Sequence, residues 1–195
     1  MKKTFLLAIV MVSYLATPAA AADYIIDKDQ TNIGFSVKHM LISNVKGRFR
    51  NFSGSFSFDE KTKLFSRAEL TVNADSIDTE VTNRDRHLRS SDFLDVEKCP
   101  KITFNLKNSE VLDDGTLRVT GDLTIHCITR EIMLQGEFLG AAKTPMGVKV
   151  AGFTATGRIN RGDFGLKWNQ ALELGGVLVG EEVKFQIEVE GIQKP

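Results

Sequence analysis

The stretch Phe52–Phe58 reads FSGSFSF, and it shows most directly how this chain folds. Its phenylalanines and its glycine stand on alternate positions, with serines between them. Successive side chains of a β-strand point to opposite faces, so this alternation predicts a strand with one apolar and one water-facing side. The apolar side needs other strands or helices to pack against, which the rest of the chain must supply.

The same alternation recurs on both sides of this stretch. Apolar residues repeat at every second position in five further segments, residues 68–72, 102–106, 117–125, 132–138 and 183–189. The positions between them carry mainly polar and charged side chains, which belong in water. Asp113-Asp114-Gly115 is a tight-turn signal between two of these segments. The chain is therefore predicted to be all-β, with many short antiparallel strands.

Such strands either close into a barrel or pair into a sandwich. A closed barrel of about eight strands has an interior that side chains fill or that holds one small ligand. Gly54, Gly121 and Gly136 fall on the inward positions. They either mark bends at bulges and barrel corners or leave interior room for a guest, and the residues alone leave both interpretations open.

The N-terminal segment has the pattern of a signal peptide. Lys2 and Lys3 precede the apolar run FLLAIVMVSYL, and small residues end the segment at Ala22. The run is about half of the roughly 20 residues that a membrane-spanning helix needs, so no stable membrane insertion is expected. Residues 1–22 are predicted to be a signal peptide, and residues 23–195 one soluble domain exported to a bacterial periplasm.

The charge balance bears on the partners of the mature chain. Without Lys2 and Lys3, the 25 basic residues become 23 against 25 acidic residues, so the mature chain is slightly acidic. Binding to a phosphate backbone requires an excess of Lys and Arg, and a nucleic-acid partner is therefore disfavoured. The oligomeric state, including a homodimer, is left open.

The segment Asn83–Asp95, NRDRHLRSSDFLD, is the part of the sequence richest in groups that transfer protons. Its spacing fits a short helix that Asp78 or Thr79 caps, with Asp85 and Arg89 four positions apart and able to pair. Phe93 and Leu94 would then cover apolar surface beneath the helix. We interpret this cluster as a structural element over one barrel opening. Its members are Arg84, Asp85, His87 and Asp92.

The histidines and the residues around them give little support to catalysis or metal binding. No nucleophile stands beside His87 in a recognisable motif, so no catalytic residue is assigned and a hydrolase is the weaker interpretation. His39, His87 and His126 show no paired spacing, and no metal or cofactor is predicted from them. His39 follows the inward positions of its strand, where it places a polar group inside an apolar interior.

The charged segment also carries a family resemblance. Residues 84–104, RDRHLRSSDFLDVEKCPKITF, resemble the signature of the YceI-like family of exported, lipocalin-like proteins associated with polyisoprenoid binding. The resemblance extends to IGFSVKHM at 33–40, VKGRFRNFSGSFSFD at 45–59, VTGDLTIHCITREIML at 119–134 and RINRGDFGL at 158–166. Cys127 departs from the family pattern, which has Gly there. The resemblance implies an extended antiparallel barrel with a short helix near one opening and a long apolar tunnel for an isoprenoid chain.

The inward positions of the predicted strands supply the candidates for the tunnel wall. They are Phe35, Val37, His39, Phe52, Phe56, Phe58, Leu70, Phe104, Leu123, Ile125, Leu134, Phe138, Phe153, Phe185 and Ile187. Trp168 lies on a predicted loop, either as a lid over an opening or as an anchor of the loop. Alternation indicates the face of each residue but not its depth, so any one of them can also be ordinary core.

An exported chain can carry a disulfide between Cys99 and Cys127. The turn at Asp113–Gly115 brings the two regions opposite each other, which favours the bond. Counting along the strands, however, places Cys99 outward and Cys127 inward, which disfavours it, and the residues leave the pairing open.

The leading function is thus an exported carrier or store that holds an isoprenoid lipid, either polyprenyl or quinone-like, inside the barrel. The alternatives are an envelope interaction protein whose barrel is filled by its own side chains and, less favoured, a hydrolase that uses the segment from Arg84 to Asp95.

Overall fold

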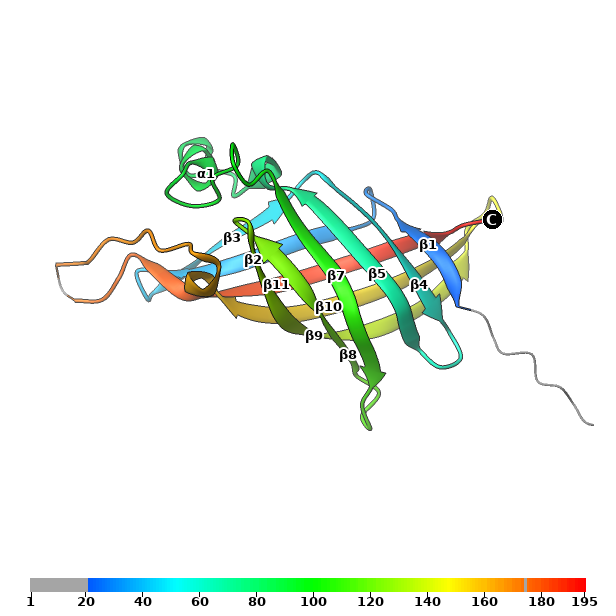
Figure 1. The fold of residues 1–195 in the computed structure, drawn as a ribbon. Coiled ribbons are helices and arrows are strands. Elements are labelled where there is room, and N and C mark those ends of the chain that lie inside the picture. Colours follow the sequence, from blue (N-terminus) through cyan, green and yellow to red (C-terminus); the bar gives the residue numbers. More distant parts are fainter. Residues whose placement is uncertain (1–20, 174) are drawn as a thin grey trace, which may run out of the picture.

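A computed structural model describes residues 21–173 and 175–195 of the chain (Figure 1). Over these residues antiparallel strands dominate, together with α1 (Thr82–Arg89) and the short 3-10 helices η1 (Ala74–Ser76) and η2 (Arg161–Phe164). The strands are β1 (Ala22–Ile26), β2 (Asn32–His39), β3 (Ser43–Phe49), β4 (Phe52–Asp59), β5 (Leu64–Asn73), β6 (Ile77–Asp78), β7 (Lys101–Val111), β8 (Leu117–Ile125), β9 (Ile128–Lys143), β10 (Lys149–Asn160) and β11 (Val179–Gln193).

These segments form a closed barrel of eight antiparallel strands, three of which are interrupted. β1 and β2 form the first strand, β3 and β4 the second, and β5 and β6 the third, while β7 to β11 are continuous. The ring closes because the last strand, β11, pairs with β1 near its C-terminal end and with β2 over the rest of that edge. The predicted barrel of about eight strands with a short helix is confirmed.

The opening stretch of the sequence is β4, and its alternation has the predicted consequence. Phe52, Phe56 and Phe58 are all buried, whereas Ser53 on the other face is exposed. Ser57 is the exception, because it is also buried and its hydroxyl donates a hydrogen bond to the carboxylate of Asp23 in β1. That bond satisfies a hydroxyl whose burial would otherwise be unfavourable.

Aromatic side chains fill one end of the barrel. Phe58 is fully buried, and its ring centroid lies 4.8 to 4.9 Å from the centroids of three other phenylalanine rings. We call this cluster the aromatic plug; it consists of Tyr24, Phe56, Phe58, Phe65, Phe138 and Phe153. At its rim Tyr24 Oη donates a 3.2 Å hydrogen bond to Glu60, which also pairs with Lys149. Burial, followed by the charge of Glu60, raises the pKa of Tyr24.

The three inward glycines are sites of close approach. A Cβ atom at Gly54 would lie 2.5 Å from the carbonyl oxygen of Glu69, and one at Gly121 would lie 2.5 Å from the Phe104 ring. At Gly136 the nearest atom would be the carbonyl oxygen of Thr154, at 2.6 Å. Gly54 and Gly121 are therefore positions of close contact whose inward space is already occupied, and they leave no room for a guest. Only Gly136 lies on the wall of the interior cavity described below.

Candidate ligand-binding site

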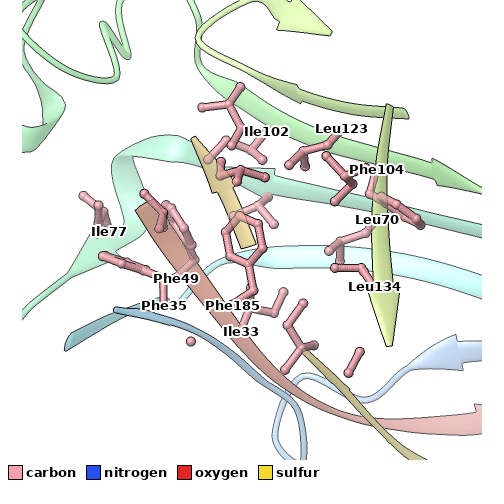
Figure 2. A pocket seen from close by; sticks show the side chains of 18 of the residues that line it. Ile33, Phe35, Phe49, Leu70, Ile77, Ile102, Phe104, Leu123, Leu134 and Phe185 are labelled. Atoms are coloured by element: carbon pink, nitrogen blue, oxygen red, sulfur yellow. The ribbon is translucent and has the colours of Figure 1, made fainter. Parts of the chain in front are cut away.

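The barrel encloses a cavity of about 600 Å³ between the aromatic plug and α1. Figure 2 shows part of its wall, where Ile33 and Phe35 of β2, Leu70 of β5, Phe104 of β7 and Leu123 of β8 surround one common space. Protein cavities that bind small ligands have volumes of roughly 300–1,000 Å³. The cavity is therefore large enough for a ligand, and its wall along the barrel is almost entirely apolar.

Most of the residues predicted to line a tunnel do line this cavity. The structure places these on its wall: Phe35, Val37, His39, Phe56, Leu70, Phe104, Leu123, Ile125, Leu134, Phe153, Phe185 and Ile187. Three placements were wrong. Phe58 and Phe138 lie in the part of the aromatic plug that does not reach the cavity, and Phe52 packs in the core without reaching it. That the lining residues bind a ligand stays a prediction.

The cavity wall also includes residues that the prediction omitted. Val45 and Phe49 of β3 line it, and they alternate with Asn44, Lys46 and Arg48 in the pattern used elsewhere. Extending the alternation to this segment would have found them. Residues of the helix and of the loop after β10 carry no such periodic signal.

Helix α1 and the segment that follows it cover the end of the barrel opposite the plug (Figure 1). Asp85 is buried and accepts hydrogen bonds from the backbone N–H of Thr79 at 2.9 Å and from its hydroxyl at 2.5 Å. Phe93 and Leu94 are also buried and face the cavity, as expected. These contacts give the charged cluster a structural role in covering the barrel.

Two details of the predicted helix were wrong. The residue before α1 is Val81, and neither Asp78 nor Thr79 caps the helix, because Thr79 lies one turn earlier and acts as a donor to Asp85. Asp85 does not pair with Arg89 either. Arg89 instead donates hydrogen bonds to the carbonyl oxygens of Asp75 at 2.6 Å and Ile77 at 2.7 Å, which ties α1 to η1 and β6.

Trp168 meets α1 across the mouth of the cavity. Its ring centroid lies 4.7 Å from that of His87 and 5.2 Å from that of Phe93, and it lines the cavity. His87 Nε2 is 2.9 Å from Asp92 Oδ2, which fixes the imidazole ring in this position. Among the described residues no hydroxyl or thiol is hydrogen-bonded to the His87 side chain. The ring of Trp168 therefore has the position of a lid. The His87–Asp92 pair orients the imidazole ring against which Trp168 packs.

Arg161 anchors the loop that carries Trp168. It begins η2 directly after β10, is only 5 % exposed, and donates hydrogen bonds to the carbonyl oxygens of Leu166, Trp168 and Gly180. Burial lowers the pKa of Arg161 and the charge of Glu181 opposes that change, but a guanidinium stays protonated in proteins. Arg161 also lines the cavity, and strand alternation did not single it out, although it lies in the segment RINRGDFGL that carries part of the family resemblance.

The structure contains a disulfide between Cys99 and Cys127, whose Cα atoms are 5.4 Å apart. The count of strand positions was misleading because neither cysteine lies in a strand. Cys99 precedes β7, and Cys127 lies in the β8–β9 turn with a φ of 59°. The bond joins the segment after α1 to the barrel wall beside the cavity mouth.

Replacing Cys127 with alanine is expected to lower the free energy of unfolding by about 2–4 kcal/mol, because the lost bond closes a loop of 28 residues in the unfolded chain. Thermal unfolding of the wild type with and without reductant provides the matched comparison. Reductant should lower the midpoint of the wild type to that of the variant and leave the variant unchanged. Equal midpoints for oxidised wild type and variant would contradict the expected contribution.

Comparison with known proteins agrees with this architecture. Residues 24–191 match the family model described as the YceI-like domain. The chain belongs to the YceI-like family. It is 39 % identical to Protein YceI of Escherichia coli O6:H1 over 198 residues, covering 100 % of both chains. The crystal structure of the Campylobacter jejuni YceI protein superposes with a TM-score of 0.71 and 34 % identity, over 81 % of this chain and 90 % of that one.

A third neighbour of this YceI-like chain is more distant. It is described as a polyisoprenoid binding domain from Saccharophagus degradans implicated in plant cell wall breakdown, and it has a TM-score of 0.61 at 13 % identity. The alignment covers 89 % of this chain and 99 % of that domain. At this identity the similarity establishes the shared barrel fold.

The described part of the YceI-like chain was also searched for two other features. Within residues 21–173 and 175–195, no helix is both long and apolar enough to cross a membrane. The same residues contain no group of three or more His, Cys, Asp or Glu side chains arranged to hold a metal ion. The predicted signal peptide falls almost entirely on residues 1–20, which lie outside the described part.

Proposed function

We propose that this protein is an exported carrier or store that holds a long isoprenoid chain, either polyprenyl or quinone-like, in the barrel cavity. The observation that carries the proposal is the apolar cavity of about 600 Å³. Transfer of hydrocarbon from water into such a cavity contributes roughly 0.8 kcal/mol for each buried CH₂ group. Family membership and the polyisoprenoid-binding description of the Saccharophagus neighbour support the isoprenoid chemistry.

The cavity favours this function over the alternatives. An interaction protein with a filled barrel needs no interior space, whereas strands from all sides of this barrel surround a common void (Figure 2). A hydrolase that uses the charged segment would need a nucleophile or a bound metal near His87. Asp85 is instead engaged with Thr79 and His87 with Asp92, so the segment supports a role as cover over the cavity.

Export to the periplasm is part of the same proposal. The pattern of residues 1–22 and the disulfide that joins Cys99 to Cys127 support it, because disulfides persist in oxidising compartments. The mature chain is expected to begin close to Asp23. Intact-mass measurement of protein from the periplasmic fraction tests this, and retention of Met1 would contradict it.

Native mass spectrometry followed by solvent extraction tests the bound ligand. Protein purified without detergent is expected to release an apolar species whose mass fits a prenyl chain. The stripped protein should then bind a polyprenol or a quinone at micromolar concentration. An empty protein that binds neither compound would support the filled-barrel interaction protein instead.

A further inference from the structure

The residues that follow α1 cover the cavity with few polar ties to the barrel wall. We call residues 90–98 the cover segment. Phe93 and Leu94 within it are buried and line the cavity. The hydrogen bonds that the segment donates, as found among the described residues, all end on residues 87–95; one example runs from the Leu94 N–H to the Leu88 carbonyl oxygen at 3.0 Å. These bonds fold the segment onto α1 but do not hold it to the barrel.

A disulfide supplies a covalent tie between the cover segment and the barrel. Cys99, the residue directly after the segment, is bonded to Cys127 in the turn between β8 and β9. β8 and β9 remain paired up to this turn, and His126 Nδ1 in the turn lies 3.1 Å from the Phe164 carbonyl oxygen in η2. The disulfide therefore fastens the end of the cover segment to a well-ordered part of the barrel wall.

Without the disulfide, the middle of the cover segment would be held mainly by apolar contacts. Before the segment, Arg89 ties α1 to η1 and β6, and beyond it the Ala74 N–H donates a 2.9 Å hydrogen bond to the Pro100 carbonyl oxygen. Between these two points the Phe93 ring packs on the Trp168 ring at a centroid distance of 5.2 Å. Apolar contacts are not directional, so loss of the disulfide would let the segment open transiently while both its ends stay attached.

The position of Cys127 suits a bond that reacts with a reductant in solution. Cys127 is exposed, whereas Cys99 is buried. Cys127 and His126 both have a left-handed backbone, with φ of 59° and 50°. A two-residue turn with this backbone favours Asn-Gly, and a cysteine there is strained. The turn therefore bears a conformational cost that presents one sulfur of the disulfide at the surface.

Neither sulfur belongs to the cavity wall. Cys99 and Cys127 are not among the described residues that line the cavity, whereas Leu94 on the cover segment and Ile125 on β8 are. Breaking the bond would therefore leave the surface that contacts a guest unchanged and alter the freedom of the cover. Such an arrangement changes the rates of ligand entry and release more than the affinity for the ligand.

We propose that the Cys99–Cys127 disulfide is a redox latch that holds the cover segment over the cavity until a dithiol reductant opens it. One thiolate of the dithiol attacks Cys127 Sγ, the disulfide breaks, and Cys99 leaves as a thiolate that takes up a proton. The second thiol of the reductant then displaces Cys127, so both cysteines end as thiols and the dithiol ends as a disulfide. This inference concerns access to the cavity, and it rests on the proposed function only for the presence of an apolar guest.

Stopped-flow fluorescence of Nile red, an apolar probe, tests the latch on the full-length mature protein after removal of bound ligand. Association at several probe concentrations gives the entry rate and the release rate, with and without dithiothreitol. Reduction is expected to raise both rates at least about tenfold, because a disulfide that closes a loop of 28 residues contributes at least that factor to an opening equilibrium. The equilibrium affinity should change by less than about twofold, because both rates rise together.

Two variants assign the change in rates to the bond. Cys127→Gly removes the disulfide and suits the left-handed backbone of the turn, so it should show the fast rates with and without dithiothreitol. Phe52→Ala is the matched control, because Phe52 is buried in the core away from the cavity wall and its truncation lowers stability while the disulfide stays intact. The control should keep the slow rates of the oxidised wild type and become faster only on reduction.

The outcomes separate the latch from the proposed function. Equal rates for the oxidised and the reduced wild type overturn the latch and leave the carrier function standing. Rates in oxidised Phe52→Ala as fast as those in Cys127→Gly also overturn it, because lost stability and not the lost bond would then open the cover. If the reduced protein loses its β-sheet circular dichroism, the disulfide is structural and the latch is wrong. If Nile red binds in neither redox state, the cavity takes no apolar guest, and the proposed function fails together with this inference.

Discussion

Replacing Ala155 with phenylalanine is expected to abolish binding of a prenyl chain while the barrel remains folded. Ala155 lies on β10, lines the cavity and pairs with Gly136 on β9. Neither residue has a side chain that extends beyond Cβ into the cavity. A phenylalanine ring added there would occupy the path of the ligand and cover apolar surface, so the ligand loses its site without loss of the core.

Titration of the ligand-free protein with farnesyl phosphate measures the loss of affinity. The loss is expected to exceed a hundredfold, because most of the buried CH₂ contacts, worth about 0.8 kcal/mol each, would be removed. Thr156→Phe is the matched control. Thr156 is the next residue on the same strand, its side chain lies on the outer face, and it is part of the same pairing with β9. Wild-type affinity in Ala155→Phe, with the fold intact by circular dichroism, would show that the ligand does not occupy this cavity.

Replacing Phe58 with alanine should cause the largest loss of stability. The side chain is fully buried in the aromatic plug, and its ring packs against Phe65, Phe138 and Phe153 at centroid distances of 4.8 to 4.9 Å. Truncation of a buried phenylalanine costs about 3–5 kcal/mol, because the removed ring leaves a cavity that its neighbours fill only in part. For a domain of this size the thermal midpoint should fall by roughly 6–20 °C.

Thermal and denaturant unfolding of the stripped protein measure this loss without a contribution from ligand. Leu139→Ala is the matched control, because Leu139 lies beside the plug residue Phe138 on β9 but is 61 % exposed. Its stability should stay within about 0.5 kcal/mol of the wild type. A loss below 1 kcal/mol in Phe58→Ala would mean that the plug collapses around the missing ring and is not a rigid end of the cavity.

Of the two interpretations that the sequence leaves open for Gly121, the one in which it leaves interior room for a guest is wrong. The inward space at Gly121 is filled by the Phe104 ring, so a large residue there would clash with the wall before reaching a ligand. Ala155, paired with Gly136, is the position where added volume enters the cavity. The alternation of the sequence gives both positions the same face and cannot distinguish them.

The sequence by itself determined which face of each strand is apolar, because successive side chains point to opposite sides of a strand wherever it lies. Phe56 and Phe104 were predicted to face inward on that basis, and both line the cavity. The all-β class, the short helix over one opening and the family also followed from local patterns and motif order. Each of these three conclusions depends on residues that are close together in the sequence.

Only the tertiary structure decided how deep each side chain lies along the barrel. Phe58 and Phe104 share the inward face, yet one belongs to the plug and the other lines the cavity. Depth depends on the register between strands and on bulges such as the one between Leu106 and Asn108, which shift every later residue. Residues outside the strands, Cys99, Cys127 and Arg161, follow no period at all. The Cys99–Cys127 disulfide and the position of Arg161 at the cavity mouth arise from contacts between segments far apart in the chain, which no local pattern encodes.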